Sequence, residues 1–440
     1  MVKINMVRRI VSFFKGTLLD ALRLLPTSKE GLKSVYGVSL YRNALYLMAN
    51  SGVNAVLGLV FWVVVARLYS VEEVGLGSAL ISAGILLSFI GTLGLGFGII
   101  RFLPSSNDKA RLLNSCFTIS LFASVIIAFI FLAGLPFWSP KLMFLRENLV
   151  FLAAFVGFVA VMALYNLLTR TFVGFRRAGF TLANCIIFSV LKIVLVVALA
   201  ISFKVFGIFA SWELAMAVCL IVSFLLFLPQ ILHRYRPLPS FRRQITNEMV
   251  HFSFANFIGE LLQNAPAWIL PLMVLNLISA EANAYFYITW TMAWLLIQIP
   301  LWTSLSFFAE GSYEEEKLSV DLRRSLKMIA LLLVPAVVIL FFLGDKLLLL
   351  FGREYSEGGT RLLLLLVPAA IPASINFLYL GIARVKQKLR EIILVTGAIA
   401  FGTLILSYLL LPYMGILGAG VGWLASQVIV AIVLLPRLKT

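Results

Sequence analysis

Residues 251–276, HFSFANFIGELLQNAPAWILPLMVLN, decide how the chain is built. The stretch is long and apolar enough to cross a bilayer, because a helix of about 20 residues spans a hydrocarbon core of about 30 Å. It nevertheless carries Asn256, Glu260, Gln263 and Asn264. A basic linker precedes it, and the sequence after it resembles the sequence before that linker. We therefore expect it to be the first helix of the second half of a two-lobed membrane protein.

The composition also indicates a helical membrane protein. Of the 440 residues, 62% are hydrophobic and only 12% are charged, which excludes an ordinary soluble domain. We expect an all-α polytopic fold with about twelve transmembrane helices. The expected spans are 44–66, 75–100, 112–134, 149–169, 179–203, 208–230, 249–276, 283–309, 325–344, 362–383, 391–411 and 414–435.

The net charge of +17 is explained by membrane topology, so it does not indicate a nucleic-acid partner. If the N-terminus is cytoplasmic, 28 of the 36 Lys and Arg residues lie in cytoplasmic segments and seven lie outside. Lys192 alone lies within a span. An excess of Lys and Arg in cytoplasmic loops is the rule for helical membrane proteins. We expect a multi-pass protein of the cell membrane with both termini cytoplasmic.

An internal repeat divides the chain into two copies. ARLYSVEEVG at 66–75 resembles LNLISAEANA at 275–284, and VFGIFASWELA at 205–215 resembles YMGILGAGVGWLA at 413–425, at offsets of 209 and 208 residues. Six spans per copy give both copies the same orientation, with a pseudo-two-fold axis along the membrane normal and a central cavity between them. The expected segments are 1–42 (a basic amphipathic cytoplasmic helix, or else a basic tail), 43–232 (first six-helix bundle), 233–248 (cytoplasmic linker) and 249–436 (second bundle).

Two ionisable residues lie deep in the predicted spans, where charged groups are costly and usually functional. Lys192 could attract a phosphate into a cavity, or it could be a structural lysine paired with Glu213 or Glu260. Glu260 could bind H⁺ or Na⁺ for coupling, or it could pair with a cation. No other cofactor is expected.

The first spans of the two copies carry polar residues at matching positions. At the offset of 209, Glu260 aligns with Ser51 and Gln263 aligns with Asn54. Asn50 and Asn264 extend these two polar faces. We expect both faces to line the central cavity. Alternatively, the amides are interhelical hydrogen-bond partners, each worth about 1 kcal/mol.

The sequence offers little for catalysis or metal binding. Cys116, Cys185 and Cys219 all lie within apolar spans, and the chain has only two histidines. It contains no DxD or HExxH motif, and the nearest glycine-rich stretch, GLGFG at 94–98, lies inside the second span, where small residues permit close helix packing. We therefore expect no enzyme activity, no catalytic residues, no disulfide and no metal site.

The stretch at 41–104, YRNALYLMANSGVNAVLGLVFWVVVARLYSVEEVGLGSALISAGILLSFIGTLGLGFGIIRFLP, resembles the N-terminal signature of polysaccharide-type flippases of the multidrug/oligosaccharidyl-lipid/polysaccharide (MOP) exporter superfamily. The shared pattern is an apolar span ending in AR-L-S-EE-G, then a glycine-rich span ending in arginine. The resemblance covers about residues 41–436. It implies two six-helix bundles in a V, and export of an undecaprenyl- or dolichyl-linked oligosaccharide to the outer leaflet by alternating access.

The resemblance further implies a cationic cavity for the pyrophosphate, with the lipid tail held at a lateral gap. By matching, Arg42, Arg67, Arg101 and Lys192 are the candidate cations, although arginines at span ends are also common interfacial anchors. The implied partners are the lipid-linked oligosaccharide, membrane lipids and glycan-assembly enzymes, and we expect a monomer. Two other functions remain open: cation-coupled export of drugs or toxins, and a non-transporting scaffold for glycan assembly.

Overall fold

The computed structural model describes residues 39–233, 235–240, 245–311 and 318–438. Within these ranges the chain is helical and without strands, and twelve segments are long and apolar enough to cross a membrane. The predicted all-α polytopic fold is therefore confirmed. The predicted N-terminal amphipathic segment up to residue 38 and part of the predicted linker lie outside the described residues.

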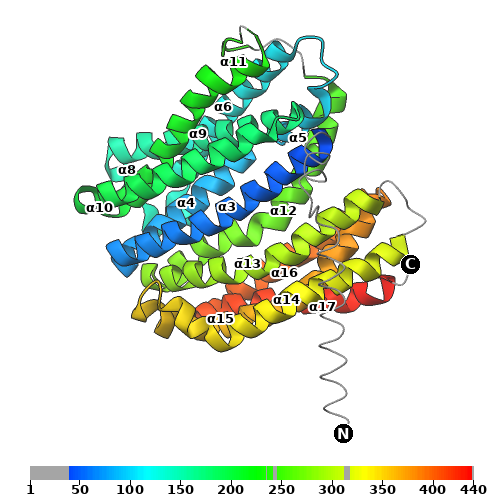
Figure 1. Ribbon diagram of the computed structural model, residues 1–440. Coiled ribbons are helices and arrows are strands. Elements are labelled where there is room, and N and C mark those ends of the chain that lie inside the picture. Colours follow the sequence, from blue (N-terminus) through cyan, green and yellow to red (C-terminus); the bar gives the residue numbers. More distant parts are fainter. Residues whose placement is uncertain (1–38, 234, 241–244, 312–317, 439–440) are drawn as a thin grey trace, which may run out of the picture.

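The first bundle occupies the upper half of Figure 1. Its long helices are α3 (Ser39–Leu68), α4 (Val71–Gly91), α5 (Leu95–Phe102), α6 (Lys109–Ala133), α9 (Leu149–Gly174) and α10 (Ala178–Val222), and its short elements are α7 (Leu135–Trp138), η1 (Pro140–Leu142), α8 (Phe144–Glu147), η2 (Ser223–Phe227) and α11 (Leu228–Ile231). α10 contains two membrane crossings, which meet at Lys204, whose φ of 44° and ψ of −133° are not helical.

The second bundle lies against the first, with α12 and α13 at the boundary (Figure 1). It consists of α12 (Asn247–Leu277), α13 (Ala280–Gly311), α14 (Leu318–Leu348), α15 (Arg353–Val385), α16 (Leu389–Met414), α17 (Ile416–Leu434) and η4 (Leu435–Leu438).

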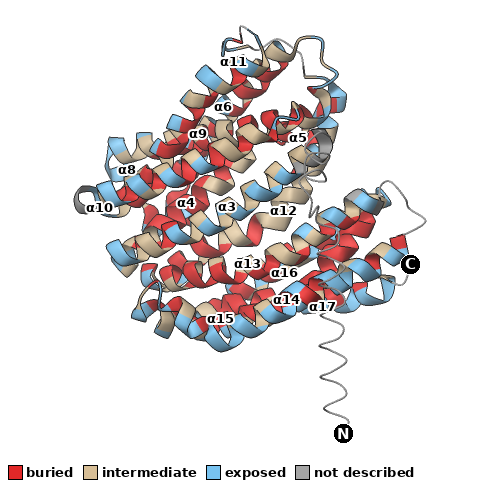
Figure 2. Ribbon diagram, viewed as in Figure 1, coloured by how far each residue is buried: buried red, intermediate tan, exposed pale blue. Residues whose placement is uncertain are grey.

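Apolar side chains cover the outer surfaces of both bundles. Phe129 on α6, Phe342 on α14 and Phe401 on α16 are all exposed, whereas buried positions are concentrated where helices face one another (Figure 2). So large an apolar surface is unfavourable in water. It suits the hydrocarbon of a bilayer, where each helix satisfies its own backbone hydrogen bonds.

Two serines confirm the repeat near the start of each copy. The Ser70 hydroxyl accepts a hydrogen bond from the Glu73 backbone N–H at 3.3 Å, and the Ser279 hydroxyl accepts one from the Ala282 N–H at 3.1 Å. Both serines therefore cap the second helix of their copy. The predicted offset of 209 residues is correct in this region.

Later in each copy the predicted register is wrong by three residues. The turn before the fifth span places Arg176 at φ 56° and its counterpart Gln387 at φ 53°, an offset of 211. The turn before the last span places Lys204 at φ 44°, ψ −133° and Gly415 at φ 59°, ψ −148°. The sequence alignment had matched Gly207 with Gly415, because glycine is the usual residue in such a conformation. In the first copy, however, a lysine adopts it.

The second predicted span, 75–100, is broken into α4 and α5. Leu93 has φ 50° and Gly94 has φ 73°, so the chain makes a left-handed turn between the two helices. The break lies at a close contact with α12, since a Cβ added to Gly94 would be 2.5 Å from the Ser253 carbonyl oxygen. A continuous helix was predicted because hydropathy does not register this interhelical contact.

The pseudo-symmetry pairs two interfaces between the bundles. In the sealed interface, α4 and α5 pack along α12, and Phe89 stacks on Phe257 at a centroid distance of 5.3 Å. In its counterpart, the open interface, α3 and α13 touch little. On α3, a Cβ added to Gly52 or Gly58 would meet no atom within 4 Å. The bundles therefore separate on one side only.

One end of the molecule, which includes the turns at Leu68 and Lys204, is closed; we refer to it as the closed end. There α4 approaches α13 so tightly that a Cβ on Gly75 would lie 1.8 Å from the Ala280 carbonyl oxygen. The Asn283 side-chain amide donates to the Gly75 carbonyl at 2.7 Å. We refer to the other end, with the arginine-rich turn at Arg176, as the basic end.

A symmetric pair of contacts reinforces the closed end. Arg67 at the end of α3 donates to the backbone carbonyls of Leu349 and Leu350, at 2.6 and 2.8 Å, just after α14. Its counterpart at the offset of 209, Asn276 of α12, donates to the Ser139 hydroxyl in the first bundle at 2.9 Å. Each copy thus holds the other through the end of its first helix. Arg67, predicted as a cavity cation, binds helix-end carbonyls instead.

Candidate functional site

The main candidate site is a cavity of about 260 Å³ at the open interface, which we call the central cavity. It is lined by residues of α3, α10 and α13: Asn50, Ser51, Asn54, Ala55, Gly58, Leu59, Trp62, Lys192, Trp212, Tyr287, Thr291, Trp294, Leu295, Gln298 and Trp302. Side-chain amides and indole rings share its wall. This combination offers hydrogen-bond donors and acceptors beside flat apolar surfaces, as ligand sites commonly do.

Lys192 is the charged residue of the central cavity, as the sequence predicts. It is only 2% exposed, and its Nζ lies 5.0, 4.6 and 4.5 Å from the ring centroids of Phe61, Phe188 and Trp212. These aromatic rings attract a cation through their π-electrons. Among the described residues Lys192 forms no salt bridge, so the alternative pairing with Glu213 or Glu260 does not occur. A positive charge without a carboxylate partner therefore lies at the cavity wall.

Glu260 forms an ion pair that joins the two bundles. Arg170 Nη2 of α9 donates to both carboxylate oxygens of Glu260 on α12, at 2.8 and 3.0 Å. The pair is about one-third exposed and lines a separate cavity of about 170 Å³ beside the sealed interface. The Arg170 guanidinium also lies 4.9 Å from the ring centroid of Phe97. The sequence left two roles open for Glu260, binding of H⁺ or Na⁺ and pairing with a cation. In this structure Glu260 is paired with a cation, Arg170.

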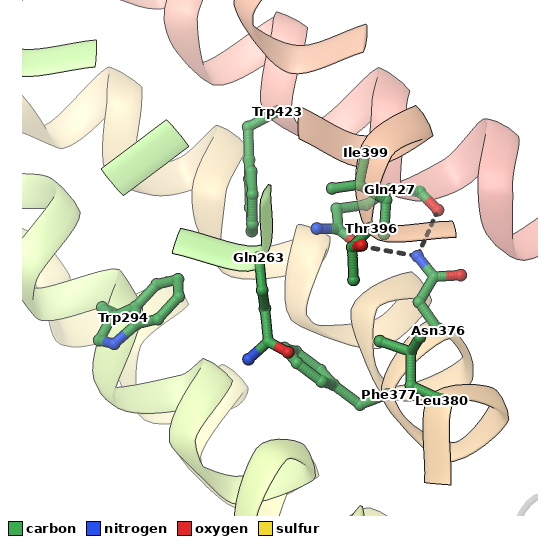
Figure 3. Close-up of a pocket in the computed structure, with 9 residues that line it drawn as sticks. All are labelled: Gln263, Trp294, Asn376, Phe377, Leu380, Thr396, Ile399, Trp423 and Gln427. Carbon is green, nitrogen blue, oxygen red and sulfur yellow. Dashed lines mark hydrogen bonds between the residues drawn. The ribbon is translucent and has the colours of Figure 1, made fainter. Parts of the chain in front are cut away.

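Gln263 lines a small cavity within the second bundle (Figure 3). Arg384 Nη2 donates to Gln263 Oε1 at 3.2 Å. Across the cavity, Asn376 donates through Nδ2 to Gln427 Oε1 at 2.7 Å. The cavity measures about 20 Å³, enough for about one water molecule. Trp294 is part of the wall of both this cavity and the central cavity.

The predicted meeting of two polar faces across one cavity is wrong. Asn50 and Asn54 line the central cavity, but Glu260 and Gln263 each line a different one. Asn264 donates to the backbone carbonyl of Glu260 in its own helix at 2.9 Å. The reason is the asymmetric packing of the bundles, which presses α12 against α4 and α5 and separates it from the cavity of α3.

Two arginines, Arg170 and Arg384, were missed because the sequence places them in cytoplasmic loops. The apolar runs end near residues 169 and 383, yet α9 continues to Gly174 and α15 to Val385. The sequence contained one weak indication of a site at Arg170. Asn166 precedes it by about one helical turn, so the two polar side chains lie on the same face of the helix. Both arginines meet the polar residues of α12 from opposite bundles.

The remaining predicted cations lie outside the central cavity. Arg101 of α5 lies 5.3 Å from the ring centroid of Phe252 on α12, a contact near the basic end. Arg42 shares a pocket of about 420 Å³ with Arg176 and Arg177. Of the four predicted cations, only Lys192 lines the central cavity.

Comparison with solved structures shows which known proteins share this fold. The chain shares the fold of an inward-facing multidrug resistance MATE family transporter of the MOP superfamily, with TM-score 0.68 and 16% identity over 90% of this chain and 97% of that one. It also shares the fold of the lipid II flippase MurJ in an inward closed conformation, with TM-score 0.71 and 14% identity over 90% of this chain and 88% of that one. A third match is the MATE multidrug transporter DinF-BH, with TM-score 0.65 and 16% identity over 91% of this chain and 95% of that one.

The family follows from the sequence itself. The family model described as polysaccharide biosynthesis protein matches residues 64–358, and the chain belongs to that family. It is a multi-pass membrane protein with the fold of MOP superfamily transporters, as its sequence predicts. A search of curated proteins gave no match.

Proposed function

We propose that this protein flips a polyprenyl-phosphate- or polyprenyl-pyrophosphate-linked oligosaccharide from the cytoplasmic to the outer leaflet of the cell membrane, for assembly of a surface polysaccharide. The observation that carries the proposal is Lys192, a buried ammonium without a carboxylate partner at the wall of the central cavity. The aromatic rings around Lys192 attract its charge, but a buried charge is compensated best by an ion of opposite sign. A phosphate entering the cavity would supply that compensation.

The lining of the central cavity suits the sugar part of such a substrate. Asn50, Asn54 and Gln298 can hydrogen-bond to hydroxyl groups, while the exposed Trp302 offers a flat face to a sugar ring. The open interface between α3 and α13 adds a lateral route. Along it a polyprenyl tail can remain in the bilayer while the polar headgroup enters the protein.

The conformation suits loading from the basic end. The closed end is held by Asn283, Arg67 and Asn276, and the excess of Lys and Arg in the loops favours a cytoplasmic location for the basic end. In an alternating-access cycle these contacts would break while the open interface closes. Glu260 would then be free to exchange Arg170 for H⁺ or Na⁺, which would provide coupling.

Export of cationic drugs is the second candidate, and the charges disfavour it. A cationic ligand in the central cavity would face Lys192, and the one deep carboxylate that the sequence identified is already paired with Arg170. The proposal needs one copy of the chain, with glycan-assembly enzymes supplying the substrate. A non-transporting scaffold would have no use for a polar cavity.

Reconstituted vesicles test the proposal. Flipping of a fluorescent polyprenyl-pyrophosphate oligosaccharide is followed with a membrane-impermeant quencher. Lys192→Met should slow flipping about tenfold or more, because a charge-assisted hydrogen bond is worth about 1.5–3 kcal/mol. Lys192→Arg should retain most of the rate. Lys346→Met, which removes an exposed lysine of α14, is the control and should not change it. A wild-type rate in Lys192→Met, or efflux of organic cations without lipid flipping, would refute the proposal.

A further inference from the structure

A second basic site lies at the basic end of the first bundle, apart from the central cavity. This pocket of about 420 Å³, which we call the arginine pocket, is lined by Arg42, Asn43, Tyr46, Arg176, Arg177, Gly179, Phe180, Ala183 and Phe227. Three guanidinium groups thus surround one concave surface, and no carboxylate belongs to its lining. Within the described residues none of the three arginines forms a salt bridge.

The backbone fixes the arginines relative to one another. The N–H groups of Arg176 and Arg177 donate to the carbonyls of Val173 and Phe172, both at 2.9 Å, which closes the turn after α9. The Ala178 N–H at the start of α10 donates to Asn43 Oδ1 at 2.9 Å. This bond ties α3, which carries Arg42, to the turn that carries the other two arginines.

The pocket has the features of a site for a phosphate attached to a lipid. Arginine binds phosphate oxygens through two parallel N–H groups. The N-terminal end of α10, at Gly179 in the wall, adds a favourable dipole for an anion. The rings of Tyr46, Phe180 and Phe227 form an apolar wall beside the cations. A free inorganic phosphate would make no use of that wall, whereas the first carbons of a lipid chain would.

The second copy provides an internal comparison. At the offset of 211, the N–H groups of Gln387 and Lys388 close the same turn, at 3.1 and 2.8 Å, beside a pocket of about 290 Å³. In this pocket Glu391 accepts hydrogen bonds from Lys388 Nζ at 2.9 Å and from the Tyr379 hydroxyl. The hydrogen bond and the charge of Glu391 raise the pKa of Lys388. Phe180 stands at the equivalent position in the first copy. The second pocket therefore contains its own anion, and the arginine pocket does not.

We propose that the arginine pocket binds the phosphate group of a membrane lipid at the basic end, either a phospholipid or a polyprenyl phosphate. The site is separate from the central cavity and requires no transport cycle, so it goes beyond the proposed function. A bound lipid would hold α3, one side of the open interface, against the start of α10.

Equilibrium binding to the purified full-length protein tests this site. The probe is a fluorescent phosphatidylglycerol added in neutral detergent. Arg176→Gln/Arg177→Gln should weaken binding about fivefold for each arginine removed, since a basic residue contributes about 1 kcal/mol toward an anionic lipid. Glutamine is compatible with the turn, because Gln387 has the same conformation in the second copy. Lys386→Gln/Lys388→Gln removes the same charge from the other pocket and should change binding less than about twofold.

Competition identifies the lipid. Displacement of the probe by polyprenyl phosphate supports the site and assigns it to the carrier lipid, while displacement by unlabelled phosphatidylglycerol alone supports it and assigns it to phospholipid. Equal weakening by both double variants, no weakening by either, or equally effective displacement by inorganic pyrophosphate would overturn the proposal. Because the assay measures binding at equilibrium, a protein that binds the probe but does not flip oligosaccharide would refute only the proposed function.

Discussion

The sealed and open interfaces are formed by equivalent helices of the two copies, yet they differ in packing and in charge. At the sealed interface, glycine contacts, stacked aromatic rings and the Arg170–Glu260 ion pair join α4, α5 and α9 to α12. At the open interface, Gly52 and Gly58 of α3 face unoccupied space, and the amides of Asn50 and Asn54 remain available to a ligand. The repeated arrangement of helices therefore produces a closely packed interface on one side and a lateral cavity on the other.

The difference between the interfaces fits the asymmetric substrate of the proposed function. A substrate with a sugar headgroup and a lipid tail needs a polar cavity that opens to the bilayer on one side. Two identical halves would give either two such openings or none. Polar residues at equivalent positions of α3 and α12 instead have different partners. Those of α3 line the central cavity, whereas Glu260 and Gln263 of α12 bind Arg170 and Arg384.

The largest expected effect comes from adding one methyl group at each interface. Gly94→Ala should destabilise the protein by about 1–2 kcal/mol through its left-handed backbone, and by about 1–3 kcal/mol more through the clash with Ser253 and Phe257. Gly58→Ala, in a helix with nothing within 4 Å, should stabilise it by up to about 1 kcal/mol. Denaturant unfolding in detergent measures both. Equal effects would mean that the two interfaces do not differ in packing.

The ion pair should have the next largest effect. Glu260→Gln and Arg170→Gln should each destabilise the protein, with a coupling energy of about 1–2 kcal/mol in a double-mutant cycle, because the pair makes two charged hydrogen bonds but is one-third exposed. The control is Glu357→Gln. It breaks the exposed Arg353–Glu357 pair and should leave the free energy of unfolding nearly unchanged, because solvent screens an exposed pair. A coupling energy near zero would show that the pair does not hold the sealed interface together.

The smallest effect is expected at the closed end, where the two copies make equivalent contacts. Arg67→Gln and Asn276→Ala each remove one side of the symmetric closed-end contact. Each should lower the free energy of unfolding by about 0.5–1.5 kcal/mol, the worth of a typical hydrogen bond, with similar values for the two. Arg361→Gln, at an exposed position of α15, should cause little change. A large difference between Arg67→Gln and Asn276→Ala would contradict the symmetry of the closed end.

The sequence predicted the features that depend on local composition. Hydropathy gave twelve spans, because crossing a bilayer requires a continuous apolar stretch. The match of Ser70 with Ser279 in the repeat came from the sequence, and the structure shows that both serines cap a helix. Lys192 was singled out from its depth alone, with a cavity role and a structural role both left open, and the structure places it in the wall of the central cavity.

The sequence did not predict features that depend on how helices pack. Arg170 and Arg384 follow the apolar runs, so only the observed helix lengths place them beside α12. Arg42 and Arg176 are far apart along the chain, and the hydrogen bond from the Ala178 N–H to Asn43 brings their segments together. The register error at Gly415 arose because backbone conformation could not be inferred from residue type. In the first copy a lysine, Lys204, has the positive φ that usually requires glycine.

By itself the sequence determined that this chain is a duplicated, twelve-span membrane protein of the polysaccharide biosynthesis family. Hydropathy, charge bias and repeats can be followed along the chain without knowing how its helices pack. Only the tertiary structure decided that Glu260 lies in the junction between the bundles and that Gln263 lines a cavity within the second bundle. The packing of α12 against α4, α5 and α16 fixes which side chains meet. That packing includes close contacts such as Gly94 against Ser253, which involve residues distant in the sequence.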